Sequence, residues 1–219
     1  MLARTDLKKG HGLPLVFLHG LLGTAADWEA VCDHLPTCHC IGFDLPGHGR
    51  SPFLEEFQID IPRFHLIGYS MGGRIALQYA AKHPEQIASL TLLSVHPGLA
   101  TQEEKQNRLL SDTNWAKLLF ELSIDDFLTR WYDQPLFQPF RPDLNLRKNQ
   151  NIPALAASLL HYSLAHQPHF TLHNVLIGEF DTKFRALHAN PLLIPNSGHM
   201  IHLENPKAVA DIIQQRISQ

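Results

Sequence analysis

The 219-residue sequence lacks several features that would assign it to whole classes of proteins. Its cysteines are Cys32, Cys38 and Cys40, and an odd number within one short segment does not form a disulfide framework. No apolar run approaches the roughly 20 residues that span a bilayer, and the start, MLARTDLKKGHG, lacks the apolar core of a secretory signal. No lysine- and arginine-rich run stands out, and 21 acidic residues face 18 basic ones. We therefore expect a cytoplasmic protein that binds neither nucleic acid nor a membrane.

The segment TCHC raises the question of a metal site, because it places Cys38, His39 and Cys40 side by side. Alternation along a strand sends the two cysteines to one face and the histidine to the other. No second pair of ligands with metal-site spacing follows. We expect no metal here, and small apolar thiols at the entrance of a strand are the better interpretation.

Short apolar runs alternate with helix-like segments through most of the chain. The runs are apolar throughout rather than at every second position, which is typical of strands covered on both faces. Strand, helix and strand joined by short links predict an α/β fold with a mostly parallel sheet and helices on both faces. The runs are 13–20, 39–51, 64–70, 89–95, 173–181 and 190–199, and the helical segments are 25–35, 72–83 and 205–218.

This alternation breaks in the middle of the chain, where residues 101–137 and 153–165 read as helices with no strand between them. An all-helical insertion in such a chain usually forms a cap over the carboxyl ends of the strands, where open α/β sheets bind ligands. We therefore expect a core of residues 1–97 and 170–219 with a helical cap at 98–169.

The run 64–70 ends in Gly68-Tyr69-Ser70-Met71-Gly72, directly before a helical segment. A serine between glycines at a strand-to-helix turn is the pattern of a nucleophile elbow, in which the hydroxyl is exposed above the sheet. Glycines are needed because a Cβ in so sharp a turn would clash with neighbouring backbone. Ser70 is therefore the candidate nucleophile or base.

A serine hydroxyl needs a histidine to take its proton and an acid to orient that histidine. His199 follows the last apolar run in a glycine-containing loop, and Asp181 ends the run before it. Glu179 is the weaker acid because it lies closer to the strand body, and Asp44 precedes the elbow in the chain. We expect Asp181 to orient His199 and Asp44 to fix the loop LPGHGRS.

Backbone amides beside the elbow are the candidates for an oxyanion hole. One should come from Leu21, in the loop after the first apolar run, and the other from Met71, which follows the serine. His19 is tempting as a base, but its expected role is to hold that loop.

The motifs HG, DLPGHGRS, GYSMGG, GEFD and SGH occur in the order typical of the α/β-hydrolase superfamily, which the chain resembles over nearly its whole length. Finer motifs resemble the 2-succinyl-6-hydroxy-2,4-cyclohexadiene-1-carboxylate synthases of menaquinone biosynthesis. They are HPGL (96–99), NRLLSDTNWA (107–116), RWYDQPLF (130–137), LRKNQN (146–151) and GEFDTKFRAL (178–187).

The resemblance implies a Ser70, Asp181 and His199 triad. It also implies substrate-binding residues, which are Arg108, Arg147, Arg74, Tyr69, Trp131 and Tyr132. The family's substrate is a small polycarboxylate, and planar guanidinium groups suit carboxylates because they donate two parallel hydrogen bonds.

The implied activity is a lyase reaction that needs no metal or organic cofactor. It eliminates pyruvate from 2-succinyl-5-enolpyruvyl-6-hydroxy-3-cyclohexene-1-carboxylate, with the triad as base. Two alternatives stay open: a serine carboxylesterase or C–C bond hydrolase with the same triad, and a non-catalytic binding protein of this fold.

The sequence departs from the family pattern between Ser51 and Phe64, where only 12 residues stand in place of a full helix. A parallel crossover needs about a dozen residues, so we expect no long helix at 52–63. Phe53, Leu54, Phe57, Ile59 and Ile61 should instead form a small apolar cover. We expect about seven strands and leave open whether the protein is a monomer or a homodimer.

Overall fold

The structure is a computed structural model, and it describes residues 1–138 and 140–218. A single sheet forms the core, with the strand order β1-β3-β2-β4-β5-β6-β7. Strand β1 is antiparallel to β3 and every other pair is parallel, so the predicted mostly parallel sheet of about seven strands is confirmed. The strands are β1 (Arg4–Lys8), β2 (His11–Leu18), β3 (Cys38–Phe43), β4 (Phe64–Tyr69), β5 (Ile87–Leu93), β6 (Leu176–Gly178) and β7 (Leu192–Ile194).

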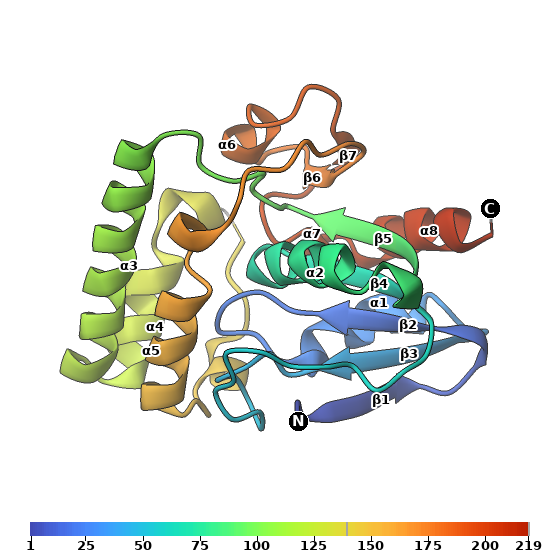
Figure 1. Ribbon diagram of the computed structural model, residues 1–219, viewed down its shortest axis with the longest axis horizontal. Helices are drawn as coiled ribbons and strands as arrows, with labels where there is room; N and C mark the ends of the chain where they lie inside the picture. The colour runs from blue at the N-terminus through green and yellow to red at the C-terminus, as the bar shows by residue number, and fades with distance from the viewer. Residues whose placement is uncertain (139, 219) are drawn as a thin grey trace.

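Helices cover both faces of this sheet because its strands are apolar on both sides (Figure 1). Leu15 and Phe17 of β2 pack on one face, against η1 (Ala25–Trp28), α1 (Glu29–Asp33), α7 (Ile201–Glu204) and α8 (Pro206–Ile217). The alternate residues Val16 and Leu18 pack on the other face, against α2 (Met71–Lys82). The short elements η2 (Pro84–Gln86) and α6 (Thr182–Arg185) lie in the remaining links.

A group of helices stands beside the sheet and forms the cap (Figure 1). At its neck the Phe170 amide donates to the Pro97 carbonyl oxygen at 2.7 Å, and Gln167 Nε2 donates to the His96 carbonyl oxygen at 3.2 Å. The two chain segments that flank the predicted cap therefore lie side by side. The cap elements are α3 (Gln102–Glu121), α4 (Ile124–Tyr132), η3 (Pro135–Phe137), η4 (Leu144–Arg147), α5 (Ile152–His161) and η5 (Leu164–His166). Within the described residues, no helix combines the length and the hydropathy that a bilayer crossing requires.

The short link at 52–63 contains no helix, as predicted. Ile59 and Ile61 are buried against α2, and Leu54 and Phe57 pack on the same cluster. The Tyr79 hydroxyl accepts a hydrogen bond from the Ile59 amide at 3.1 Å. These four residues give the predicted apolar cover, whereas Phe53 packs instead against His161, at 5.8 Å between ring centroids. No large apolar side chain of this link is exposed among the described residues.

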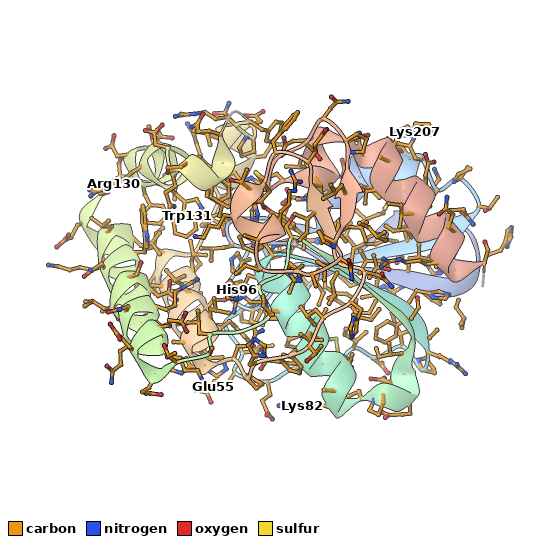
Figure 2. All side chains as sticks on the ribbon, turned by 90° about the horizontal axis from the view of Figure 1, so that it is seen from above. Glu55, Lys82, His96, Arg130, Trp131 and Lys207 are labelled. Carbon is orange, nitrogen blue, oxygen red and sulfur yellow. The ribbon has the colours of Figure 1, made fainter. Side chains whose placement is uncertain are left out.

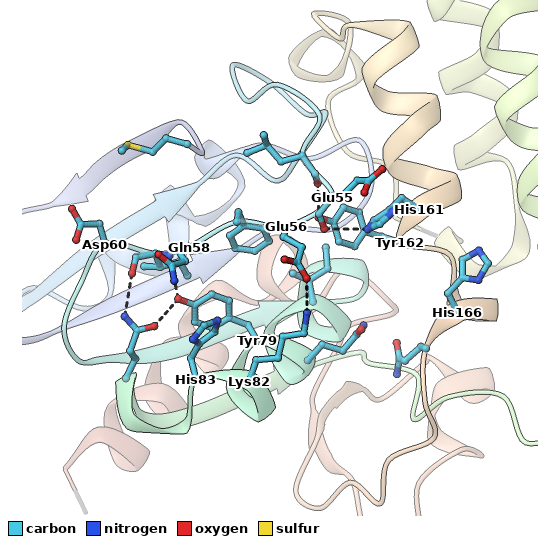
Figure 3. Close-up of a pocket in the computed structure, with 18 of the residues that line it drawn as sticks. Glu55, Glu56, Gln58, Asp60, Tyr79, Lys82, His83, His161, Tyr162 and His166 are labelled. Carbon is cyan, nitrogen blue, oxygen red and sulfur yellow. Dashed lines mark hydrogen bonds and ion pairs between the residues drawn. The ribbon is translucent and has the colours of Figure 1, made fainter.

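Beside this link lies an open hollow of about 1420 Å³ between α2 and the end of the cap (Figure 3). Charged and polar groups line much of it, including Glu56, which accepts a hydrogen bond from Lys82 at 3.1 Å. It contains none of the three triad residues. The hollow is therefore separate from the candidate active site.

Candidate active site

Ser70 occupies a strained turn between β4 and α2. Its backbone has φ +51° and ψ −114°, a region that a residue with a side chain rarely adopts and that persists only when the surroundings enforce it. A Cβ on Gly72 would lie 2.2 Å from the His19 carbonyl oxygen, and one on Gly68 would lie 2.6 Å from the Gly73 Cα. The glycines of the motif are thus required by close backbone packing, and the elbow has the geometry that the sequence predicted.

The three predicted triad residues come together at the carboxyl ends of β4, β6 and β7. His199 Nε2 lies 3.3 Å from Ser70 Oγ, and His199 Nδ1 lies 2.7 Å from Asp181 Oδ2. Asp181 and His199 are both buried, with 5% and 2% of their surface exposed. The predicted position of His199 between the serine and the acid is confirmed.

The choice of acid is supported by the surroundings of both carboxylates. Asp181 Oδ1 accepts a hydrogen bond from the Phe184 amide at 3.0 Å and so caps α6, while its other oxygen faces His199. Glu179 instead accepts from the Asn196 amide at 3.0 Å, away from His199. Because Asp181 is held at both oxygens, it can fix the orientation and tautomer of the histidine.

The loop after β2 brings Leu21 to the site. Neither the Leu21 nor the Met71 amide donates a hydrogen bond to a protein acceptor among the residues that the structure describes. The next residue, Leu22, is fully buried with φ +65°. Its carbonyl accepts from Arg147 Nη1 at 3.2 Å and Gln150 Nε2 at 3.3 Å. The cap therefore holds this strained loop in place, and the two amides remain available for an oxyanion.

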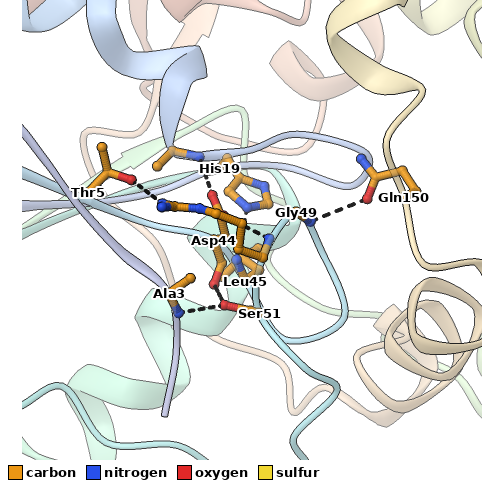
Figure 4. A network of polar contacts seen from close by, with 10 residues as sticks. Ala3, Thr5, His19, Asp44, Leu45, Gly49, Ser51 and Gln150 are labelled. Atoms are coloured by element: carbon orange, nitrogen blue, oxygen red, sulfur yellow. Dashed lines mark hydrogen bonds and ion pairs between the residues drawn. The ribbon is translucent and has the colours of Figure 1, made fainter.

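His19 and Asp44 serve the loops around the site (Figure 4). His19 Nδ1 lies 2.7 Å from the Gly20 carbonyl oxygen, and Nε2 accepts from the Leu45 amide at 2.9 Å. Burial lowers the pKa of His19 to about 4, which keeps the ring neutral. Asp44 accepts hydrogen bonds from the Ala25 amide at 2.8 Å and the Arg50 amide at 3.0 Å. Both residues hold loops, as the sequence analysis expected.

A cavity of about 410 Å³ opens above Ser70 between the core and the cap. Figure 2 labels His96 on the core side of this junction and Trp131 on the cap side. All six predicted substrate-binding residues line the cavity together with Ser70 and His199: Tyr69, Arg74, Arg108, Trp131, Tyr132 and Arg147. The predicted convergence of Arg108 and Arg147, which are 39 positions apart in the chain, is confirmed.

Two of the three cavity arginines are already paired with carboxylates, which the sequence analysis did not foresee. Arg147 Nη1 lies 2.7 Å from Asp27 Oδ2, and both side chains are buried. Arg108 Nε lies 2.8 Å from Asp112 Oδ2, one helical turn away on α3. Burial raises the pKa of Asp27, although the Arg147 guanidinium opposes that rise. These arginines offer hydrogen-bond donors to a ligand but little net charge.

Arg74 differs, because its Nη1 donates to the Tyr162 carbonyl oxygen at 2.8 Å and it is buried on the first turns of α2. Burial and the nearby Arg108 lower its pKa to about 9, so it still carries a positive charge at neutral pH. Tyr69 lies beside it in the elbow, with its ring centroid 5.5 Å from that of His199.

The aromatic predictions also fall on the cavity wall. Trp131 packs edge-on against Trp115 at 4.8 Å between ring centroids, and Tyr132 packs on Phe137 at 5.0 Å. Phe137 in turn contacts the His199 ring at 5.9 Å. The cap thus places an apolar wall over the histidine, which excludes water from one side of the site.

Sequence reasoning missed several cavity residues. They are Asp27, His96, Asp112, Lys183 and Phe184. Asp112 could have been found from its i,i+4 spacing to Arg108. Asp27 could not, because its partner is 120 positions away.

The fold and this site define the class of protein. The sequence profile of a family described as the alpha/beta hydrolase fold matches residues 14–176, and the chain belongs to that family. A thermophilic esterase from Thermogutta terrifontis shares the fold at a TM-score of 0.73, with 23% identity, covering 99% of this chain and 93% of that one.

Other relatives narrow the class. A protein named 2-succinyl-6-hydroxy-2,4-cyclohexadiene-1-carboxylate synthase from Enterobacter sp. (strain 638) is 36% identical, covering 93% of this chain and 92% of its own. One of the same name from Salmonella arizonae is 34% identical, covering 98% of each chain. The solved structure of MenH from S. aureus matches at a TM-score of 0.83 and 25% identity, covering 99% of this chain and 97% of that one. The chain belongs to the 2-succinyl-6-hydroxy-2,4-cyclohexadiene-1-carboxylate synthase family.

Proposed function

We propose that the protein eliminates pyruvate from 2-succinyl-5-enolpyruvyl-6-hydroxy-3-cyclohexene-1-carboxylate to give 2-succinyl-6-hydroxy-2,4-cyclohexadiene-1-carboxylate. The observation that carries the proposal is a hydrogen-bonded Ser70, His199 and Asp181 set at the floor of a cavity with several basic side chains. A substrate with carboxylates on the ring, on the succinyl arm and on the enolpyruvyl arm requires such a cavity, because an unpaired carboxylate in a closed site is costly.

The reaction starts with Ser70 as the base. Its hydroxyl, with its proton passing to His199, removes the proton on the ring carbon next to the succinyl carbonyl. The electrons of that C–H bond move to the carbonyl oxygen, which becomes an enolate held by the Leu21 and Met71 amides. Asp181 stabilises the imidazolium that forms.

The second step expels the leaving group. The enolate reforms the carbonyl, the ring double bond shifts, and the C–O bond to the enolpyruvyl group breaks, so that the ring becomes a 2,4-diene. The departing enolate takes up the proton from His199 and leaves as pyruvate. No acyl-enzyme forms, and the triad ends in the state in which it began.

The test is pyruvate release by the purified protein, compared with hydrolysis of p-nitrophenyl acetate. The proposal predicts rapid pyruvate release that Ser70→Ala abolishes without loss of fold, and an ester hydrolysis that is slow by comparison. An efficient esterase that releases no pyruvate would overturn it in favour of the carboxylesterase. Failure of both reactions, with no labelling of Ser70 by a fluorophosphonate, would favour the non-catalytic binding protein. The cytoplasmic location and the choice between monomer and homodimer remain predictions.

A further inference from the structure

The basic side chains of the cavity fall into two groups. Arg108 and Arg147 each pair with a buried carboxylate, at 2.8 Å and 2.7 Å. Arg74 and Lys183 also line the cavity, and neither has a carboxylate within ion-pair distance in the part of the chain that the structure describes. The net positive charge of the cavity therefore comes from Arg74 and Lys183.

The backbone of Lys183 is held close to the triad because it belongs to the helix that Asp181 caps. It is the second residue of α6, which begins after Asp181 and is capped by that carboxylate through the Phe184 amide. The Phe184 ring packs 4.5 Å from the His199 ring, between centroids. The neighbouring Arg185 turns away and donates to the Glu179 carbonyl oxygen at 2.7 Å. The backbone at Lys183 is thus fixed while its side chain is exposed at the cavity rim.

His96 lines the cavity near the positive charges of Arg74 and Lys183. Burial is the main cause that lowers the pKa of His96 to about 4, and the nearby Arg108, Arg74 and Lys183 contribute to this shift in that order. Its Nδ1 accepts from the Gly98 amide at 3.1 Å, so the neutral ring carries its proton on Nε2. The His96 side of the cavity therefore combines positive charge with a neutral donor, a combination that suits a carboxylate.

We propose that Lys183 is a substrate-binding residue that holds a carboxylate of the substrate at the rim of the cavity. The proposal rests on the proposed function, which supplies a substrate with three carboxylates. The two ion-paired arginines cannot neutralise all of them, because their charge is already balanced by Asp27 and Asp112. Lys183 supplies charge where the substrate enters, and Arg74 supplies it near the elbow.

The test compares Lys183→Met, which keeps most of the length and removes the charge, with Lys183→Arg, which keeps the charge. Lys207→Met is the matched control, because Lys207 is exposed on α8, pairs with Asp211 and does not line the cavity. We expect Lys183→Met to raise KM for the enolpyruvyl substrate roughly tenfold, since one charge-assisted contact is lost, with kcat within about twofold. Lys183→Arg should restore most of the affinity, and Lys207→Met should match the wild type.

A binding measurement separates this proposal from the proposed function. In the Ser70→Ala background, the enolpyruvyl substrate is titrated calorimetrically with and without Lys183→Met, and the change should weaken its Kd by a similar factor. This result would stand even if the wild type released no pyruvate. The proposal would be overturned if Lys183→Met had the same KM and Kd as Lys207→Met. It would also be overturned if Lys183→Met lost activity equally on the enolpyruvyl substrate and on p-nitrophenyl acetate, because Lys183 would then only support the position of Asp181.

Discussion

The buried pair of Arg147 and Asp27 allows stability and substrate binding to be tested apart. Arg147 Nη1 lies 2.7 Å from Asp27 Oδ2, with about 3% and 9% of the two residues exposed. Arg147→Met removes a cation from the cavity and at the same time leaves a buried carboxylate without its partner. A loss of activity in this single variant would therefore mix two effects.

The magnitudes of the two effects differ. Removing one partner of a buried ion pair costs about 3–5 kcal/mol of unfolding free energy, whereas replacing both partners by groups of similar volume is often close to neutral. We therefore expect Arg147→Met to destabilise the protein by a few kcal/mol and Asp27→Asn/Arg147→Met to recover most of that loss. Losing one charge-assisted contact to the substrate costs about 1.5–3 kcal/mol, which is roughly ten- to over a hundredfold in kcat/KM.

The assay combines urea unfolding with two activities. The double variant should unfold near the wild-type midpoint, lose pyruvate elimination by that factor, and retain far more of its hydrolysis of p-nitrophenyl acetate. Two results would contradict this role of the ion pair. One is a single variant as stable as the wild type, because Asp27 would then not depend on Arg147. The other is a stable double variant that eliminates pyruvate at the wild-type rate.

Three further outcomes follow from the structure. Gly72→Ala should destabilise the fold by at least roughly 1–3 kcal/mol, because its Cβ would lie 2.2 Å from a backbone carbonyl oxygen; a wild-type melting temperature would contradict this. Asp181→Asn should lower pyruvate elimination by roughly 10³- to 10⁴-fold with the fold intact, because the favoured His tautomer is lost; unchanged kcat would remove Asp181 from the triad. Burial lowers the pKa of His48 from 6.5 to about 3, so between these pH values the unfolded chain binds more protons at His48 than the folded protein does. The free energy of unfolding should therefore fall by up to about 1.4 kcal/mol per pH unit as the pH drops below 6.5. In urea unfolding, His48→Gln should reduce the slope of stability against pH by up to this amount, with the lowered pKa values of His19 and His96 still contributing to it. The exposed His11→Gln should leave the slope unchanged.

The sheet and the triad could be predicted because their signals are local. Apart from the charged edge strand β1, each strand is a short apolar run, and Ser70, Asp181 and His199 lie in the loops that follow such runs. Parallel strands bring their carboxyl ends to one edge, so residues far apart in the chain meet there without any need to know their contacts. The missing helix at 52–63 was equally readable, since a chain of 12 residues is too short for it.

The electrostatics of the cavity could not be predicted in the same way. The partner of Arg147 is Asp27 of η1, which lies 120 positions earlier in the chain. The packing of the cap on the core brings these two residues together. The backbone strain at Leu22, which has φ +65°, could not be predicted either, because leucine gives no sequence signal for a positive φ. Hydrogen bonds from the cap to the Leu22 carbonyl oxygen hold this conformation. Contacts between cap and core, unlike strand ends, leave no periodic pattern in the chain.

In the proposed reaction the triad acts as a base toward carbon and not as an acylating nucleophile. The most direct measurement is single-turnover pyruvate formation from the enolpyruvyl substrate carrying deuterium on the ring carbon next to the succinyl carbonyl. If the triad is a base, pyruvate formation should show a primary isotope effect, and mass spectrometry should find Ser70 unmodified throughout the turnover. Equal rates for the two isotopes together with an acylated Ser70 would contradict it.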